Sequence, residues 1–540
     1  MGQFLNIYGF LAVVLRATTL LFQSLMIGGV LFLSVALGRW RAHQTSGRPA
    51  ISCERLLRLA GIGLAASQAI YLSCESFVLI KTVGLSFLEV IGGNFFIAGV
   101  VQIVASLLVA TISYRSRRAL WILSLLSLAI LLGSVATSHA FSRVEGRTTA
   151  TIFTALHLLA TGCWIGGLPF LLISLRNLPD GAEKQTVLSR YSRIALISVG
   201  VLVASGTATA LHYVDSAQAL YGTAYGIMLL SKFVLLAVLL LLGAMNRGIV
   251  NRADGAGVRL RLQHFVAVEI GIGIAAVLTA TSMTSQPPAI DLPSGRVDAK
   301  TIVQRFTPEW PRLRTPAFSA LSPATRPLEK AEAAKDPVSL VPGQNIHLPN
   351  SPGDIAWSEY NHNWMGLLLV LMGVLATISR TGHLSFTRHW PLVFLLMGLF
   401  IFLRADPENW PLGPNGFWES FDRADVLQHR LAVLLVIAFA VFEWRVQLGK
   451  AKSAFAPLVF PLVCVAGGML LMTHNHTLDN IGEELLVEMS HLAIALLAII
   501  AGWSRWLQLK LPQRDGVIAS WIWPVCFVLM GSILLTYREA

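Results

Sequence analysis

Charged residues are scarce in this chain: Asp, Glu, Lys and Arg make up only 13% of its 540 residues. A soluble globular protein carries about a quarter, so the composition argues against a soluble fold. Cysteine is also rare. The five cysteines stand singly, and neither a CxxC nor a CxxCH motif occurs. Zinc fingers, iron–sulfur clusters and covalently attached haem are therefore not indicated.

Two further motif classes are missing. No basic tract interleaved with aromatic residues occurs, so we interpret the formal charge of +12 as a membrane-orientation signal and expect no nucleic-acid partner. The chain also has neither a P-loop nor a phosphorylated-aspartate motif. Direct ATP-driven pumping is therefore not expected.

Long apolar runs fill most of the chain. Runs of about 18 or more apolar residues are long enough to cross a bilayer as helices, and they predict an all-α, polytopic membrane bundle surrounded by lipid. About fourteen spans are expected, at 8–38, 56–80, 93–113, 119–138, 149–175, 192–213, 223–245, 264–284, 362–379, 390–403, 430–447, 456–473, 488–508 and 519–537.

Basic residues occupy every second connection between these spans, from Arg39 and Arg41 after the first to Lys510 and Arg514 before the last. Cytoplasmic loops carry the excess of Lys and Arg, so this alternation predicts that both termini are periplasmic. The first apolar stretch contains Arg16 and lacks a small-residue cleavage site. We therefore expect it to be retained as a helix.

One long segment, 286–361, differs from the rest of the chain. It is rich in Pro, Ala and Ser, and its eight basic and eight acidic residues cancel. We interpret it as an extended periplasmic linker. It divides an eight-helix membrane domain (1–285) from a six-helix membrane domain (362–540).

Three stretches of the first half form a recognisable set. The first is SHAFSRVEGRTTATIFTALHLLATGCWIGGLPFLL, the second is LLSKFVLLAVLLLLGAMNR, which follows Tyr225-Gly226 closely, and the third is HFVAVEIGIGIAAVLTATSMTSQPP. Together they resemble the copper resistance D (CopD) family over about 120–290. The resemblance implies copper movement across the bacterial inner membrane, alongside a periplasmic copper-binding partner of the CopC type.

The same half holds three candidate metal ligands. His139, His157 and His212 fall in the outer halves of neighbouring predicted helices. An ionisable group inside a membrane usually faces the bundle interior or a water-filled path, and imidazole binds copper, zinc and iron. The alternative is that each histidine only bonds a backbone carbonyl. A charge relay or a structural pairing could form among Arg16, Lys232 and Glu269.

The second half concentrates ligands in MTHNHTLDNIGEELLVEMSHLA, an expected periplasmic hairpin. Thioether sulfur suits Cu(I), and imidazole with carboxylate suits Cu(II), so the mixture predicts copper capture. Glu483 is set aside, because its position after Asn480 indicates a helix cap. The candidate ligands are Met472, His474, His476, Glu488 and His491.

Two more histidines fall at the same predicted boundary. His362 heads a helical stripe with two methionines, and His429 shares a face with Asp422 and Asp425. The carboxylates also fit a helix N-terminus exposed to water. We add His362 and His429 to the candidate metal ligands.

The expected function is copper transport or handling in the inner membrane, with capture at the periplasmic face, and a transporter is favoured over an enzyme. One alternative is a redox protein that holds b-type haem between His139, His157 and His212. The other is a metal-dependent membrane enzyme, for which the candidate residues are Asp425, His429, Glu488 and His491.

Overall fold

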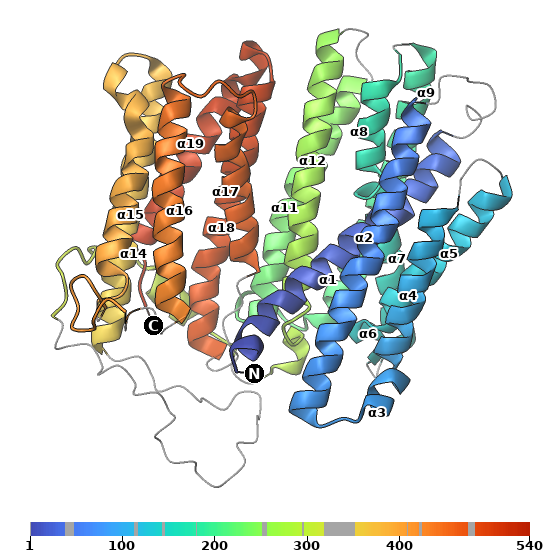
Figure 1. Ribbon diagram of the computed structural model, residues 1–540, viewed down its shortest axis with the longest axis horizontal. Coiled ribbons are helices and arrows are strands. Elements are labelled where there is room, and N and C mark those ends of the chain that lie inside the picture. The colour runs from blue at the N-terminus through green and yellow to red at the C-terminus, as the bar shows by residue number, and fades with distance from the viewer. Residues whose placement is uncertain are drawn as a thin grey trace. The chain divides into compact units, whose positions relative to one another are not determined.

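The computed structural model describes residues 2–37, 48–112, 117–142, 146–179, 181–250, 256–293, 296–317, 352–407, 409–418, 420, 424–473 and 481–539. Every regular element among these residues is a helix (Figure 1). The chain divides into two compact units. The first comprises residues 1–220 and 225–293, and the second comprises most of residues 294–540.

The first unit is built largely from long helices joined by short connections. Two of them, α1 and α2, each end in a π-helical turn, and α7 continues into α8 through a turn at Ile165–Gly167. Its helices are α1 (Gly2–Leu31), α2 (Arg48–Val78), α3 (Phe87–Gly92), α4 (Asn94–Thr111), α5 (Arg117–Ala136), α6 (His139–Ser142), α7 (Arg147–Trp164), α8 (Leu168–Asn177), α9 (Ala182–Tyr213), α10 (Ala217–Tyr221), α11 (Ala224–Val250) and α12 (Ala256–Met283).

The second unit begins with a short helix and continues as a bundle. Its helices are α13 (Ala299–Phe306), α14 (Pro352–Thr381), α15 (Val393–Arg404), α16 (Ala424–Gln447), α17 (Ala456–Met472), α18 (Ile481–Lys510) and α19 (Gln513–Leu535), with a 3-10 turn at Ser385–Leu392 before α15. Helix α18 packs along both α17 and α19, and α19 packs along α14.

The prediction of an all-α membrane bundle is confirmed. Within the described ranges, twelve helices are long and apolar enough to cross a membrane. Large apolar side chains such as Trp121, Leu125 and Leu211 are exposed, as a lipid-facing surface requires. The two other predicted spans correspond to α16 and α17, with 24 and 17 residues. A total of fourteen spans and periplasmic termini stay predictions.

Glycine allows the closest helix approach in the first unit, where α1 meets α7. A Cβ atom on Gly28 would lie 2.3 Å from backbone atoms of Gly166 and Gly167, and one on Gly166 would lie 1.8 Å from Ser24 O. No larger side chain fits between these backbones. The WIGG stretch thus supplies the small residues that close helix packing requires.

The core of the second unit is aromatic. Trp390, Phe460 and Trp523 are nearly inaccessible, and their ring centroids lie 5.3–5.5 Å apart. Tilted aromatic contacts of this kind stabilise a core beyond simple area burial. This cluster holds the 3-10 turn against α17 and α19, and so fixes the helices that position the candidate site.

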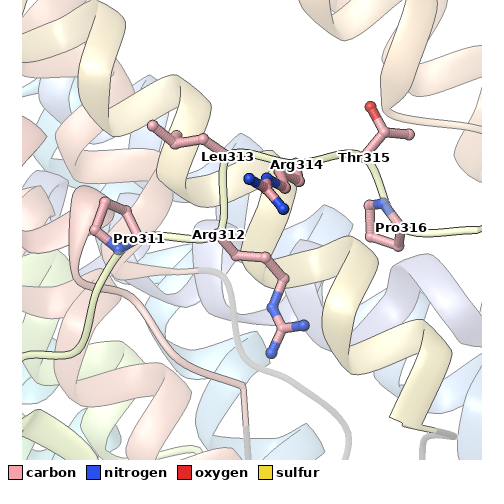
Figure 2. Close-up of a pocket in the computed structure, with 6 residues that line it drawn as sticks. All are labelled: Pro311, Arg312, Leu313, Arg314, Thr315 and Pro316. Atoms are coloured by element: carbon pink, nitrogen blue, oxygen red, sulfur yellow. The ribbon is translucent and has the colours of Figure 1, made fainter.

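Part of the expected linker lies along α14. The backbone N–H of Arg312 donates to Asn363 Oδ1 at 2.6 Å, and its Nε donates to Glu359 Oε2 at 2.9 Å. Residues 311–316 line a surface hollow beside this helix (Figure 2). Helix α14 itself begins at Pro352, before the predicted span at 362, because its first turns extend past the apolar part of the helix.

Candidate functional site

Two of the predicted ligands meet at one end of the second unit. His362, near the beginning of α14, and His491, in α18, have ring centroids 6.4 Å apart and nearly perpendicular rings. The two residues lie on different helices, and the sequence analysis placed them in separate groups of candidate ligands. The fold therefore brings together two imidazoles from different predicted clusters.

Both imidazoles are oriented in the same way. His362 Nδ1 lies 2.8 Å from Ser358 O, and His491 Nδ1 lies 2.8 Å from Val487 O. A carbonyl oxygen only accepts, so each Nδ1 carries the proton. In the neutral ring Nε2 then holds the lone pair, which is the usual arrangement of a metal-binding histidine.

The segment that follows α19 covers His362. The Tyr537 ring stacks on the His362 ring with centroids 4.1 Å apart, and its hydroxyl donates to Glu539 Oε2 at 2.8 Å. The same Glu539 oxygen accepts from Ser358 Oγ at 2.5 Å. Burial and the Glu539 carboxylate raise the pKa of Tyr537 far above its usual value, so the hydroxyl remains a donor. The helical pattern of the sequence did not predict this contact, because Tyr537 and Glu539 lie outside the helices.

Glu488 lies three residues before His491 on α18. The residue is only 7% exposed, and its Oε1 has no hydrogen-bond partner among the described residues. Burying an unpaired carboxylate oxygen is costly unless a cation, a proton or water satisfies it. This carboxylate is therefore chemically suited to face a cation.

The remaining ligands of the second half lie in different settings. Met472 is buried at the end of α17. His429 pairs through Nδ1 with Asp406 Oδ1 at 2.8 Å, a partner 23 residues upstream that sequence spacing did not indicate. His474 and His476 lie outside the described residues, as do Asp422 and the side chain of Asp425.

The three histidines of the first half occupy separate environments. His139 Nε2 donates to Thr284 O at 2.8 Å, whereas His157 Nδ1 lies 3.3 Å from Ser205 Oγ. His212 Nε2 is buried and has no hydrogen-bond partner in the described part of the chain. The carbonyl-bonded alternative thus describes His139 but not His212.

Glu269 in α12 joins three helices. Its Oε1 accepts from Trp164 Nε1 at 2.9 Å, and its Oε2 accepts from Asn246 Nδ2 at 2.8 Å. Tyr191 donates to Trp164 O at 2.5 Å. These bonds favour the structural pairing over the charge relay, because neither neutral donor carries a charge.

Across the described ranges, no three His, Cys, Asp or Glu side chains are grouped closely enough to hold one metal ion. His362 and His491 are nonetheless two predicted ligands from different helices whose rings lie against each other.

Residues 185–283 match the family described as copper resistance protein D. We refer to this stretch as the CopD-family region, after the family that it matches. It runs through α9, α11 and α12 and contains His212 and Glu269. The sequence resemblance to CopD is thereby confirmed, although the matched residues begin after the first of the three stretches that carried it.

A curated protein also matches part of the chain. The chain is 33% identical over 161 residues to the copper transport protein CutJ of Bacillus subtilis (strain 168), which covers 29% of this chain and 29% of that protein. The similarity thus spans less than a third of either protein. No solved structure matches the chain.

Proposed function

We propose that this multi-pass membrane protein transports copper across, or handles copper in, the bacterial inner membrane. The observation that carries the proposal is the CopD-family region at 185–283, together with the copper transport protein that resembles part of the chain. Copper is the cargo in this proposal and not a resident cofactor. A transporter is favoured over an enzyme.

Capture takes place at the end of the second unit that holds His362 and His491. Their proton-bearing Nδ1 atoms are fixed by backbone carbonyls, so both rings are set to offer Nε2 to a metal. Glu488 supplies a buried carboxylate on the same helix as His491. The set is completed by the other predicted ligands of this half: His429, Met472, His474 and His476.

The first unit supplies three further copper ligands, which are His139, His157 and His212. The buried Nε2 of His212, without a partner among the described residues, supports this assignment most directly. Imidazole binds both Cu(I) and Cu(II). Copper can therefore pass from one histidine to the next without a change in the type of ligand.

The site is periplasmic if the charge alternation sets the orientation. Under that topology both termini are periplasmic, and a CopC-type copper-binding protein is the partner that delivers or receives the metal. Lipids surround both units, which fits the exposed apolar side chains.

Copper flux into proteoliposomes tests the function. Purified protein is reconstituted, copper is added outside, and luminal copper is measured with an impermeant indicator. We expect uptake or release above that of protein-free vesicles, and a large loss in the His362→Ala/His491→Ala variant. Flux equal to that of empty vesicles at either orientation would overturn the transport proposal.

A further inference from the structure

A buried ionisable pair lies at the other end of the second unit. Glu443, near the end of α16, is 1% exposed, and Arg505, near the end of α18, is 8% exposed. The two side chains interact electrostatically. Neither residue belongs to the candidate copper ligands. Intramembrane charges of this kind are costly, and they often mark proton or ion pathways.

Each member of the pair retains one polar atom without a hydrogen-bond partner in the described ranges. Glu443 Oε1 accepts from Gln447 Nε2 at 2.6 Å, whereas Oε2 is unpartnered. Arg505 Nη1 donates to Gln508 Oε1 at 2.9 Å, whereas Nε is unpartnered. One acceptor and one donor are thus left at neighbouring charged groups.

Water suits this arrangement, because it can donate to Oε2 and accept from Nε together. Such a water also gives a proton a route to the carboxylate. The other titratable or charged groups around the pair are Cys464 from α17, Arg380 from α14, His389 through Trp444, and Arg445, which is exposed.

The pair and the copper site share one continuous helix. Glu488 and His491 lie towards the beginning of α18, and Arg505 lies towards its end. The separation from His491 is 14 residues, about 21 Å at 1.5 Å per residue. The same end of the unit carries Lys450 and Lys452, which the charge pattern assigns to the cytoplasm.

We propose that Glu443 is a proton-binding residue that couples proton exchange at the inner end of the second unit to copper movement. The inference rests on the proposed transport function. A proton from inner-side water adds to Glu443 Oε2 and neutralises the carboxylate, which removes its attraction to Arg505. Loss of the proton restores the charge pair, and no electron is exchanged. Helix α18 transmits the change to the copper ligands.

The test measures proton and copper flux together in proteoliposomes, with a luminal pH dye and a copper indicator. In the parent protein, we expect copper flux to depend on the imposed pH gradient. Glu443→Gln keeps the side-chain shape but cannot ionise, so proton flux should fall at least tenfold while copper binding to purified protein is retained. Arg445→Gln, an exposed charge on the same helix end, is the matched control and should behave like the parent.

Proton flux unchanged by Glu443→Gln would overturn the inference. Parent protein that moves copper without protons would do the same and leave the transport function intact, whereas the absence of any copper flux would remove both. If Glu443→Gln folds poorly because Arg505 is left uncompensated, Glu443→Gln/Arg505→Gln restores stability. Proton flux should stay lost in this double variant, and its return would make the role purely structural.

Discussion

The indole of Trp164 donates to the carboxylate of Glu269 across 2.9 Å, and so joins α7 to α12 inside the first unit. The other carboxylate oxygen accepts from Asn246 of α11. Three helices therefore depend on one buried side chain. In a membrane, where apolar helix surfaces gain little from contact with one another, such hydrogen bonds help to select the helix arrangement.

Glu269→Ala should destabilise the first unit. It leaves two buried donors unsatisfied, at a cost of about 1–3 kcal/mol each. Thermal unfolding in detergent measures the loss, and Glu269→Gln, which keeps one carbonyl oxygen, should lose less. Melting temperatures equal to the parent in both variants would contradict a structural role for this carboxylate.

Gly166→Ala should disrupt the contact between α1 and α7. The added Cβ would lie 1.8 Å from Ser24 O, so the two helices would have to separate. Gly200→Ala on α9 is the matched control, because nothing lies within 4 Å of its added Cβ. The control should be neutral or stabilise by up to about 1 kcal/mol. The yield of folded protein and its melting temperature distinguish the two variants. Equal yields and melting temperatures would contradict the close approach of Gly166 to Ser24.

Hydropathy and charge alternation predicted the helical membrane fold, because both depend on the residue composition of single segments. They also placed His362 and His491 at the outer boundary. Neither signal could pair them, since contact between α14 and α18 depends on how the bundle closes. The stacking of Tyr537 on His362 and the pairing of Asp406 with His429 were not predicted for the same reason. Each contact joins segments that are distant in sequence.

Helix boundaries illustrate a second limit. Helix α14 begins at Pro352, although its apolar run starts later. Apolar runs report the bilayer-spanning part of a helix, and polar first turns that extend into water carry no such signal. Residues 311–316 also lie along α14, where composition alone indicated an extended linker.

Acid should loosen the beginning of α13. Asp298 accepts from Thr301 N at 2.7 Å. Hydrogen bonds from the Thr301 side chain and backbone lower the pKa of Asp298 below its usual value of about 3.9. A lowered folded pKa stabilises the helix above about pH 3.9 and loses that effect as the pH falls through the lowered value. After correction for the intrinsic exchange rate, the protection of amide hydrogens at residues 299–306 should therefore fall in acid, and Asp298→Ala should show low protection at every pH. Protection that persists in strong acid would contradict the cap.

Glu488→Gln should weaken copper binding without destabilising the fold. The amide keeps the side-chain volume but cannot ionise, and it offers a cation only one oxygen. Loss of a supporting carboxylate typically costs metal affinity about 10–100-fold. Competition with a copper chelator measures the affinity, and thermal unfolding serves as the control. Unchanged copper affinity would show that Glu488 contributes only to packing.

Copper content of purified protein tests the central claim most directly. Parent protein is compared with His362→Ala/His491→Ala and with His383→Ala, an exposed histidine just beyond the far end of α14. We predict that the parent and the His383→Ala variant bind copper and show no Soret band, and that the double variant loses copper while remaining folded. Equal copper in all three proteins, or a Soret band in the parent, would contradict capture by His362 and His491.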